Sequence, residues 1–199
     1  MADAMPTRDE ALALFKEFNK GEALLRHALA VEAVMRYAAR KRGADPDPWG
    51  LVGLVHDLDY EQFPDRHCTK TAEILRGRGW PEPLVRAAAS HGWGLCSDLE
   101  PESDLEKVLY AVDELTGLVA ATALVRPSRS VLDMEARSVQ KKWKDKAFAA
   151  GVNRDVIARG AERLGVGLPE LITDVIMGMR EAAEALGLKG NVGGIPNLR

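Results

Sequence analysis

The chain has few cysteines, few aromatic residues and no long uncharged hydrophobic run. Its 199 residues include two cysteines, Cys68 and Cys96, which do not form a Cys-x-x-Cys pair. This argues against a disulfide framework or a cysteine-rich zinc site and fits a reducing cytoplasm. No apolar run approaches the roughly 20 residues that a membrane-spanning helix needs. Residues 1–6 carry an acid where a signal peptide carries base, so we expect a cytoplasmic protein without a membrane partner.

The sequence also lacks the alternating β-branched runs that are typical of strands. It is rich in Ala, Leu, Glu and Arg instead, and this composition predicts an all-α fold. We expect a single domain over residues 1–186, with a helical core bundle at about 20–126 and a C-terminal helical extension at 127–186. A glycine-containing tail at 187–199 is expected to be flexible.

Capping residues and apolar periodicity indicate where the helices begin. Thr7 and Ser103 are each the first residue of a capping box that opens a helix. An apolar stripe at helical spacing between residues 21 and 42 includes His27, which therefore points inward. Asp47 followed by proline predicts another helix start. Further starts are predicted at Asp65, with His67 in its first turn, and at Pro81, Ser130, Asn153 and Pro169, the last helix running to about Leu186.

Histidine and aspartate residues recur in these apolar segments. All four histidines lie between residues 27 and 91, and an adjacent His-Asp pair follows an apolar run. A buried imidazole or carboxylate must be paired, hydrogen-bonded or bound to a metal. Imidazole nitrogen and carboxylate oxygen are natural ligands of divalent transition metals. The sequence therefore predicts a metal site that several helices assemble from His27, His56, Asp57, His67, His91 and Asp113.

Each of these residues has a simpler explanation when it is taken alone. His27 could be a hydrogen-bonded core histidine, His67 an exposed residue, His91 a helix cap and Asp113 the partner of an arginine. One metal site explains all of them together and is favoured for that reason. Six candidate ligands exceed the three or four of a mononuclear zinc site, so the number favours two ions, about 3.5–4 Å apart in known hydrolases.

The order of these residues resembles the HD-domain metal-dependent phosphohydrolase superfamily over about residues 20–125. The resemblance rests on an early helical histidine, the His56-Asp57 pair, a later histidine and a late aspartate. It implies that His27, His56, Asp57 and Asp113 hold a first metal, and that Asp57 bridges to a second metal completed by His67 and His91. His56 and Asp57 would then be central to catalysis.

The resemblance has one departure. In a better-known version of the motif, Ile-Gly-Lys follows the His-Asp pair, whereas Leu58, Asp59 and Tyr60 stand here. No role for that lysine can be carried over. Asp59 is interpreted as a turn or capping residue, and the alternative is an acid-base group or one that orients a metal ligand.

Residues that could bind substrate are less well marked. The segment 137–146 is basic, and Arg129, Lys141 and Lys142 are predicted to bind phosphate oxygens if this segment packs over the metals. A solvated basic face is the simpler alternative. Trp93 follows His91 closely and is predicted to line a pocket for a flat group, with a role in the core or rim as the alternative. A nucleic-acid partner is not expected from this segment.

The predicted function is hydrolysis of a phosphate ester or anhydride in a nucleotide-like or other small phosphorylated substrate. The cofactors would be divalent metal ions, two of them on the ligand count, and Mn, Fe, Zn, Mg and Ni are not distinguished by the ligand set. Two alternatives remain, an HD-type diiron oxygenase and an HD signalling module without catalytic activity.

Overall fold

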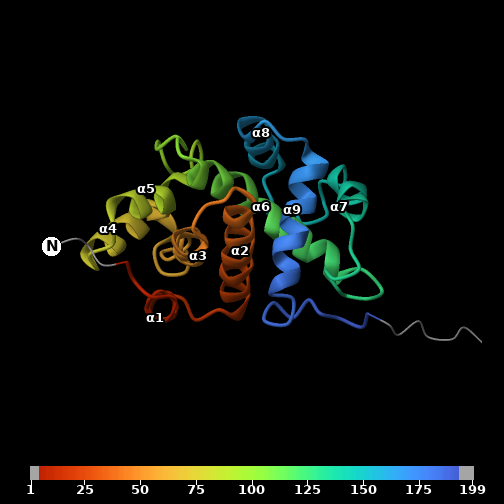
Figure 1. Ribbon diagram of the computed structural model, residues 1–199, viewed down its shortest axis with the longest axis horizontal. Coiled ribbons are helices and arrows are strands. Elements are labelled where there is room, and N and C mark those ends of the chain that lie inside the picture. Colours follow the sequence, from red (N-terminus) through yellow and green to blue (C-terminus); the bar gives the residue numbers. More distant parts are fainter. Residues whose placement is uncertain (1–4, 193–199) are drawn as a thin grey trace, which may run out of the picture.

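The computed structural model describes residues 5–192, and this range contains helices and one isolated bridge, between Trp93 and Ser97 (Figure 1). The predicted all-α fold is confirmed. No helix in residues 5–192 is both long and apolar enough to cross a lipid bilayer. The α-helices are α1 (Arg8–Phe18), α2 (Glu22–Lys41), α3 (Pro46–Val55), α4 (Thr69–Gly77), α5 (Glu82–Ser90), α6 (Asp104–Leu124), α7 (Ala136–Trp143), α8 (Arg154–Leu164) and α9 (Leu168–Glu181), and a 3₁₀ helix, η1, spans Pro64–Arg66.

The long helices α2 and α6 form the centre of the bundle. Helix α2 packs against α3, α6 and α9, while α6 also packs against α8 (Figure 1). Every residue from 49 to 55 in α3 is buried, so this short helix lies within the core. Gly53 allows its close approach, because a Cβ there would lie 3.0 Å from the backbone oxygen of Val31 in α2. The C-terminal end of α3, where the His-Asp pair follows, is thereby brought to the middle of the molecule.

Both capping boxes are present, on α1 and α6. The start of α3 differs from the prediction. Asp45, two residues before Asp47, is the N-cap, and its side chain accepts a hydrogen bond from the backbone N–H of Asp47. The Asp-Pro pair occurs twice in succession, and local sequence does not distinguish the two starts. Asn153 caps α8 as predicted.

Three other helix boundaries differ from the prediction. His67 lies in the connection between η1 and α4 rather than in a first helical turn, because α4 begins only at Thr69. Helix α7 begins at Ala136, since Ser130 uses its hydroxyl to accept from the N–H of Leu132 in a turn. Helix α9 ends at Glu181, and turns follow it.

The first part of the predicted tail is held against the bundle. Leu188 is buried, and its carbonyl accepts a hydrogen bond from the N–H of Val131. The N–H of Asn191 donates to the carbonyl of Ser128. Residues 1–4 and 193–199 lie outside the described range, and they include the rest of that tail and most of the segment used to argue against a signal peptide.

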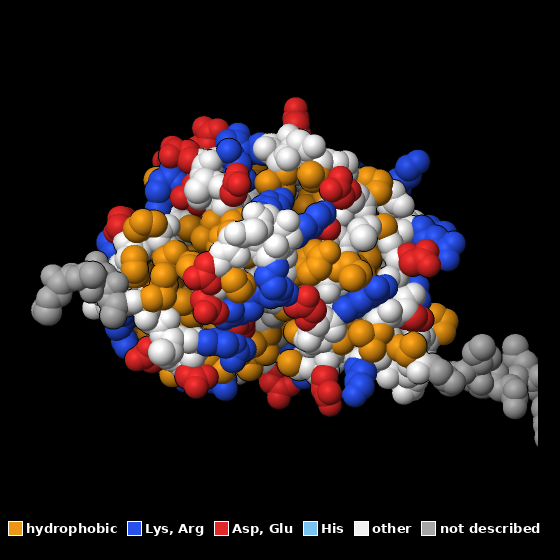
Figure 2. Space-filling model, in the orientation of Figure 1, with side chains coloured by type: hydrophobic (Ala, Val, Ile, Leu, Met, Phe, Trp, Pro, Cys, Tyr) orange, Lys and Arg blue, Asp and Glu red, His pale blue; other side chains and the backbone are white. Residues whose placement is uncertain are grey.

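Charges of both signs are interspersed on the face shown in Figure 2, with hydrophobic side chains between them. This mixture agrees with the net charge of −3. The visible face therefore has no broad surface of one charge of the kind that binds a polyanion by electrostatics alone.

Candidate metal centre

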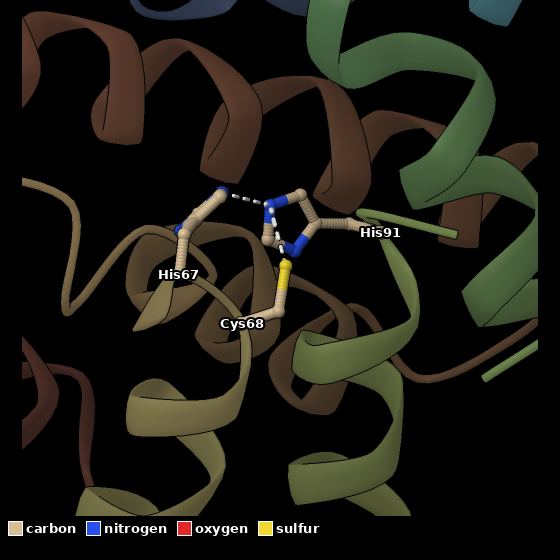
Figure 3. A group of neighbouring side chains, drawn as sticks. All are labelled: His67, Cys68 and His91. Atoms are coloured by element: carbon tan, nitrogen blue, oxygen red, sulfur yellow. Dashed lines mark hydrogen bonds between the residues drawn. The ribbon is translucent and has the colours of Figure 1, made fainter. Parts of the chain in front are cut away.

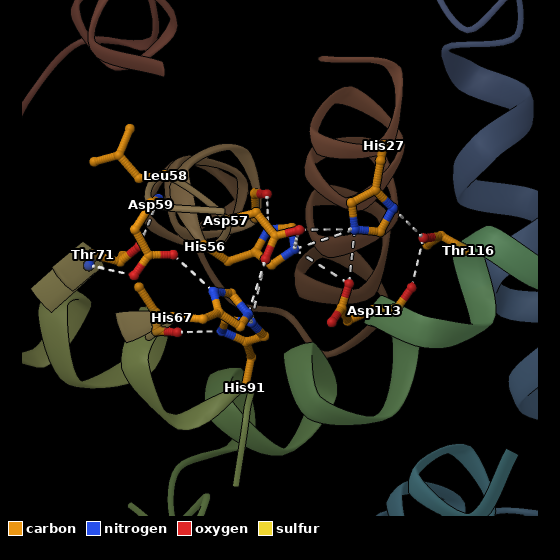
Figure 4. Close-up of polar contacts among 12 residues, drawn as sticks. His27, His56, Asp57, Leu58, Asp59, His67, Thr71, His91, Asp113 and Thr116 are labelled. Carbon is orange, nitrogen blue, oxygen red and sulfur yellow. Dashed lines mark hydrogen bonds and ion pairs between the residues drawn. The ribbon is translucent and has the colours of Figure 1, made fainter. Parts of the chain in front are cut away.

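The structure brings all six predicted metal ligands together (Figure 4). They come from five different segments: α2, the end of α3, the connection before α4, the end of α5, and α6. Their side chains are all at least three-quarters buried. They face one another around the carboxylate of Asp57, and the set is His27, His56, Asp57, His67, His91 and Asp113.

One group of ligand atoms surrounds a first position. The Nε2 atoms of His27 and His56 are 3.3 Å apart. Asp113 places Oδ1 at 2.9 Å from the first of these nitrogens and 3.2 Å from the second. Asp57 adds Oδ2, at 3.6 Å from His27 Nε2 and 3.4 Å from His56 Nε2. Two nitrogens and two carboxylate oxygens therefore converge on one point.

A second group uses the other oxygen of the same carboxylate. Asp57 Oδ1 lies 3.5 Å from Nε2 of His67 and 3.4 Å from Nε2 of His91. These two nitrogens are 3.2 Å apart. The two oxygens of Asp57 thus face two separate groups of histidine nitrogens, as a carboxylate that bridges two ions would.

These distances can be compared with those among the ligands of one ion. Ligand atoms about 2.1 Å from a common ion lie about 3.0 Å apart at right angles and about 3.4 Å apart in a tetrahedron. The measured separations within each group, 2.9–3.6 Å, fall close to these values. The residues therefore fit two divalent ions, with His27, His56, Asp57 and Asp113 at the first position and Asp57, His67 and His91 at the second.

The ring orientation of two histidines follows from their place at helix ends. His56 is the C-cap of α3, and its Nδ1 donates to the carbonyl of Gly53 at 2.8 Å. His91 is the C-cap of α5, and its Nδ1 donates to the carbonyl of Ala88 at 2.6 Å. The last carbonyls of a helix have no partner within it, so they accept these hydrogen bonds. Both rings are thereby fixed with Nε2 directed at Asp57.

Side-chain oxygens, rather than backbone carbonyls, orient the rings of the other two histidines. Nδ1 of His67 donates to Oδ1 of Asp59 at 2.7 Å. Nδ1 of His27 is 3.3 Å from the hydroxyl oxygen of Thr116, which itself donates to the carbonyl of Asp113. Every histidine therefore has an acceptor for its Nδ1 hydrogen. This selects the tautomer whose Nε2 lone pair is free to bind a metal.

In this site, pairing between opposite charges outweighs the effect of burial on the pKa values. Burial alone would lower the pKa of His56, but the carboxylates of Asp57 and Asp113 outweigh it and raise that pKa well above its ordinary value. Burial alone would raise the pKa of both carboxyls, yet His56 holds each well below its usual range. Both aspartates are therefore ionised at neutral pH, which is the form that binds metal.

Asp59 orients a ligand, contrary to its interpretation as a simple turn or capping residue. Its side chain is fully buried, with one oxygen on His67 and the other accepting from the N–H of Thr71 at 2.8 Å. The same carboxylate thus holds the ring of His67 and the first turn of α4. The position of Asp59, two residues after Asp57, could have suggested a role at the site. Sequence position alone does not show that its partner is His67, eight residues later.

Replacement of Asp59 should affect the second metal position selectively. We expect Asp59→Ala to weaken metal binding there by roughly 10–100-fold, because partners that orient a ligand have effects of this size. Binding at the first position should be retained, and Asp59→Asn should restore part of the affinity, since an amide oxygen can still accept from His67. Calorimetric titration of the metal-free variants measures both positions. Equal weakening at both positions would contradict this assignment.

The cluster is accessible from one side. The side chains of His27, His67 and Asp113 are 24%, 17% and 17% exposed, whereas that of His56 is fully buried. Tyr60 lies at this opening, with its ring 5.1 Å from that of His67 and more than half exposed. Solvent therefore reaches the cluster from the side of α2, α6 and the connection before α4.

The predicted substrate-binding residues are divided between two places. Trp93 packs 5.7 Å from the ring of Tyr110, which precedes Asp113 by one turn of α6. Lys141 and Lys142 lie on α7, which packs against α9 and α6 and lies beyond α9 from α3 in Figure 1. Lys142 contacts the ring of Phe148.

Arg129 is exposed in the turn region after α6 and has a positive φ of 49°. The contacts of the described residues do not bring it, or the two lysines of α7, to the metal cluster. The role of these three cations in substrate binding stays a prediction that these contacts do not support.

Comparison with known proteins agrees with the geometry. A family model described as the HD domain matches residues 24–118, a segment that contains all six ligands. Residues 24–118 are therefore an HD domain. This confirms the predicted membership, and because HD-domain proteins are largely phosphohydrolases, it supports the predicted class of activity at superfamily level.

The chain is also similar to proteins named ribonuclease Y. Those of Thermotoga petrophila and Thermotoga maritima are each 24% identical to it over 139 residues, which make up 68% of this chain and 27% of the relative. The chain thus spans only about a quarter of the length of these relatives. No solved structure matches the chain.

Proposed function

We propose that this HD domain is a dinuclear metal-dependent phosphohydrolase that acts on a phosphate ester or anhydride. The observation that supports this most strongly is the position of Asp57, whose two oxygens face two groups of histidine nitrogens. When bound, divalent ions at these positions would supply Lewis acidity and lower the pKa of a water molecule. His56 and Asp57 are the central ligands.

The protein's own residues would position these ions and exclude solvent behind them. His56 and His91 close the inner side of the site, because their side chains are 0% and 3% exposed. Thr116 and Asp59 hold the two rings nearest the opening. A rigid, dry inner wall and an accessible outer side favour attack on a substrate from one direction.

Arg159 and Trp93 are proposed to bind such a substrate, because both contact Tyr110, which lies one turn of α6 before Asp113. Arg159 is exposed on α8, lies 5.7 Å from the ring of Trp93 and donates to the hydroxyl of Tyr110 at 3.4 Å. Arg163 also lies over Trp93, at 4.8 Å, but pairs with Glu100. An arginine whose contacts are aromatic keeps its guanidinium available for a phosphate oxygen.

Substitution of Arg159 tests whether the substrate binds beside Trp93 or at the lysines of α7. We expect Arg159→Ala to raise KM for a nucleotide substrate by about 10-fold with a smaller change in kcat, because one charge-assisted hydrogen bond is worth roughly 1.5–3 kcal/mol. The matched control is the double variant Lys141→Ala, Lys142→Ala. Steady-state kinetics would contradict the assignment if the α7 variant, and not Arg159→Ala, raised KM.

Metal analysis combined with a substrate screen tests the proposed function. We expect two equivalents of divalent metal per chain, and metal-dependent release of phosphate or nucleoside from a panel of nucleotides, phosphomonoesters and phosphodiesters. The panel includes a short RNA, because the relatives described above are named ribonucleases. Two equivalents of iron with oxygen-dependent turnover would show an oxygenase instead. Absence of both metal and activity would show a non-catalytic module.

A further inference from the structure

The two cysteines of the chain, 28 residues apart in sequence, meet beside the metal centre. Their Sγ atoms are 2.7 Å apart. The Sγ of Cys68 also lies 4.0 Å from Nε2 of His91 (Figure 3). Cys68 directly follows His67, and Cys96 lies in the turn that follows His91. A disulfide requires sulfur atoms about 2.05 Å apart, so the pair is separated from bonding distance by a small movement.

The surrounding backbone leaves room for this sulfur pair. A Cβ at Gly92 would overlap the sulfur atoms of both cysteines, so the glycine provides the space that they occupy. Cys68 has a φ of 68°, which is uncommon for a residue other than glycine and persists only when the surrounding structure maintains it. Cys96 is exposed, whereas Cys68 is 1% exposed. The pair thus has one thiol that solvent reaches and one beneath it.

We propose that Cys68 and Cys96 are a redox modification site at which a small-molecule disulfide oxidises the two thiols to an intrachain disulfide. The sulfur of Cys96 attacks one sulfur of the reagent, forming a mixed disulfide and releasing one thiol. The sulfur of Cys68 then loses its proton and attacks that of Cys96, and the second thiol leaves. Two cysteine thiols lose two electrons and two protons, and the reagent is reduced to two thiols.

This bond would join the residue next to His67 to the segment that follows His91. Both histidines belong to the second metal position, so oxidation would act directly beside it. The chemistry itself needs only the sulfur pair and does not depend on the proposed hydrolase activity. A failure of either proposal can therefore be recognised separately.

Reaction of the purified, metal-containing protein with oxidised glutathione tests the site. The chain has no other cysteines, so every change in thiol content belongs to this pair. We expect free thiols, measured after denaturation, to fall from two per chain to none. The intact mass should fall by two hydrogens, and the peptides containing Cys68 and Cys96 should be joined within one chain.

Two variants test the roles of the two sulfurs. Cys68→Ser should accumulate the glutathione adduct on Cys96, because the second thiol is missing. Cys96→Ser should retain its free thiol, since Cys68 is buried. Retention of both thiols by the wild-type protein, a stable adduct on it, or joining between chains would overturn the proposal, and each of these outcomes is measured on the wild-type protein even if a variant fails to fold.

Discussion

Asp57→Asn should lose both metal ions and reduce hydrolysis by more than about 10³-fold, since a metal site accounts for several kcal/mol of transition-state stabilisation. The substitution would keep the shape of the side chain but would remove the charge that both groups of histidines share. A single neutral amide oxygen cannot serve two ions as a carboxylate does. Elemental analysis of the purified variant, together with activity against the best substrate of the wild-type protein, measures the two effects.

His67→Ala is the matched control for Asp57→Asn. In the proposed arrangement His67 belongs to the second position only, so this variant should keep the first metal and lose the second. Circular dichroism of both variants checks that each is folded. If Asp57→Asn retained two ions, or if His67→Ala lost both, the bridging role of Asp57 would be wrong.

Removal of the metals should destabilise the protein and should do so more strongly at higher pH. At free metal about 1,000 times the dissociation constant, binding stabilises a fold by about 4 kcal/mol, which corresponds to roughly 10 °C in Tm for a chain of this size. Metal binding requires neutral histidines, so this stabilisation grows as pH rises. Thermal unfolding with and without a chelator measures it.

The metal-free protein should show the opposite dependence on pH. The pKa values of His56 and His91 are raised in the folded state, because their carboxylate partners outweigh the effect of burial. Their contribution to stability is therefore complete below the ordinary histidine pKa of about 6.5 and is lost as pH rises through the raised values. A metal-free Tm that rises as the pH increases above about 6.5 would contradict the charge arrangement described here.

Local sequence predicted most helices because the residues that cap a helix lie next to it in the chain. The capping boxes at Thr7 and Ser103, and the cap at Asn153, form hydrogen bonds with residues two or three positions away. Such contacts involve only neighbouring residues, so the local sequence is enough to indicate them. Where two equivalent signals compete, as at Asp45 and Asp47, the choice depends on how the helix packs against α2, and the prediction was wrong by two residues.

The metal ligands could be predicted for a different reason. Imidazoles and carboxylates in apolar segments must be compensated, so their presence at His56 and Asp113 already indicated a site. Of the partners that orient them, Thr116 was not predicted and Asp59 was only an alternative, because both are ordinary polar residues, one in a helix and one in a loop. Only the packing of α2 against α6, and of the segment after α3 against the start of α4, shows that each meets a histidine.

The sequence by itself determined the helical class, most helix starts and the chemical identity of the ligands, because these depend on side-chain chemistry and on neighbours within one or two turns. Tertiary structure decided which oxygen of Asp57 faces which histidines, that Cys68 meets Cys96, and that α7 lies away from the cluster while Arg159 lies beside Trp93. These contacts join residues far apart in the chain. They depend on how whole helices pack against one another, and no short stretch of sequence specifies that packing.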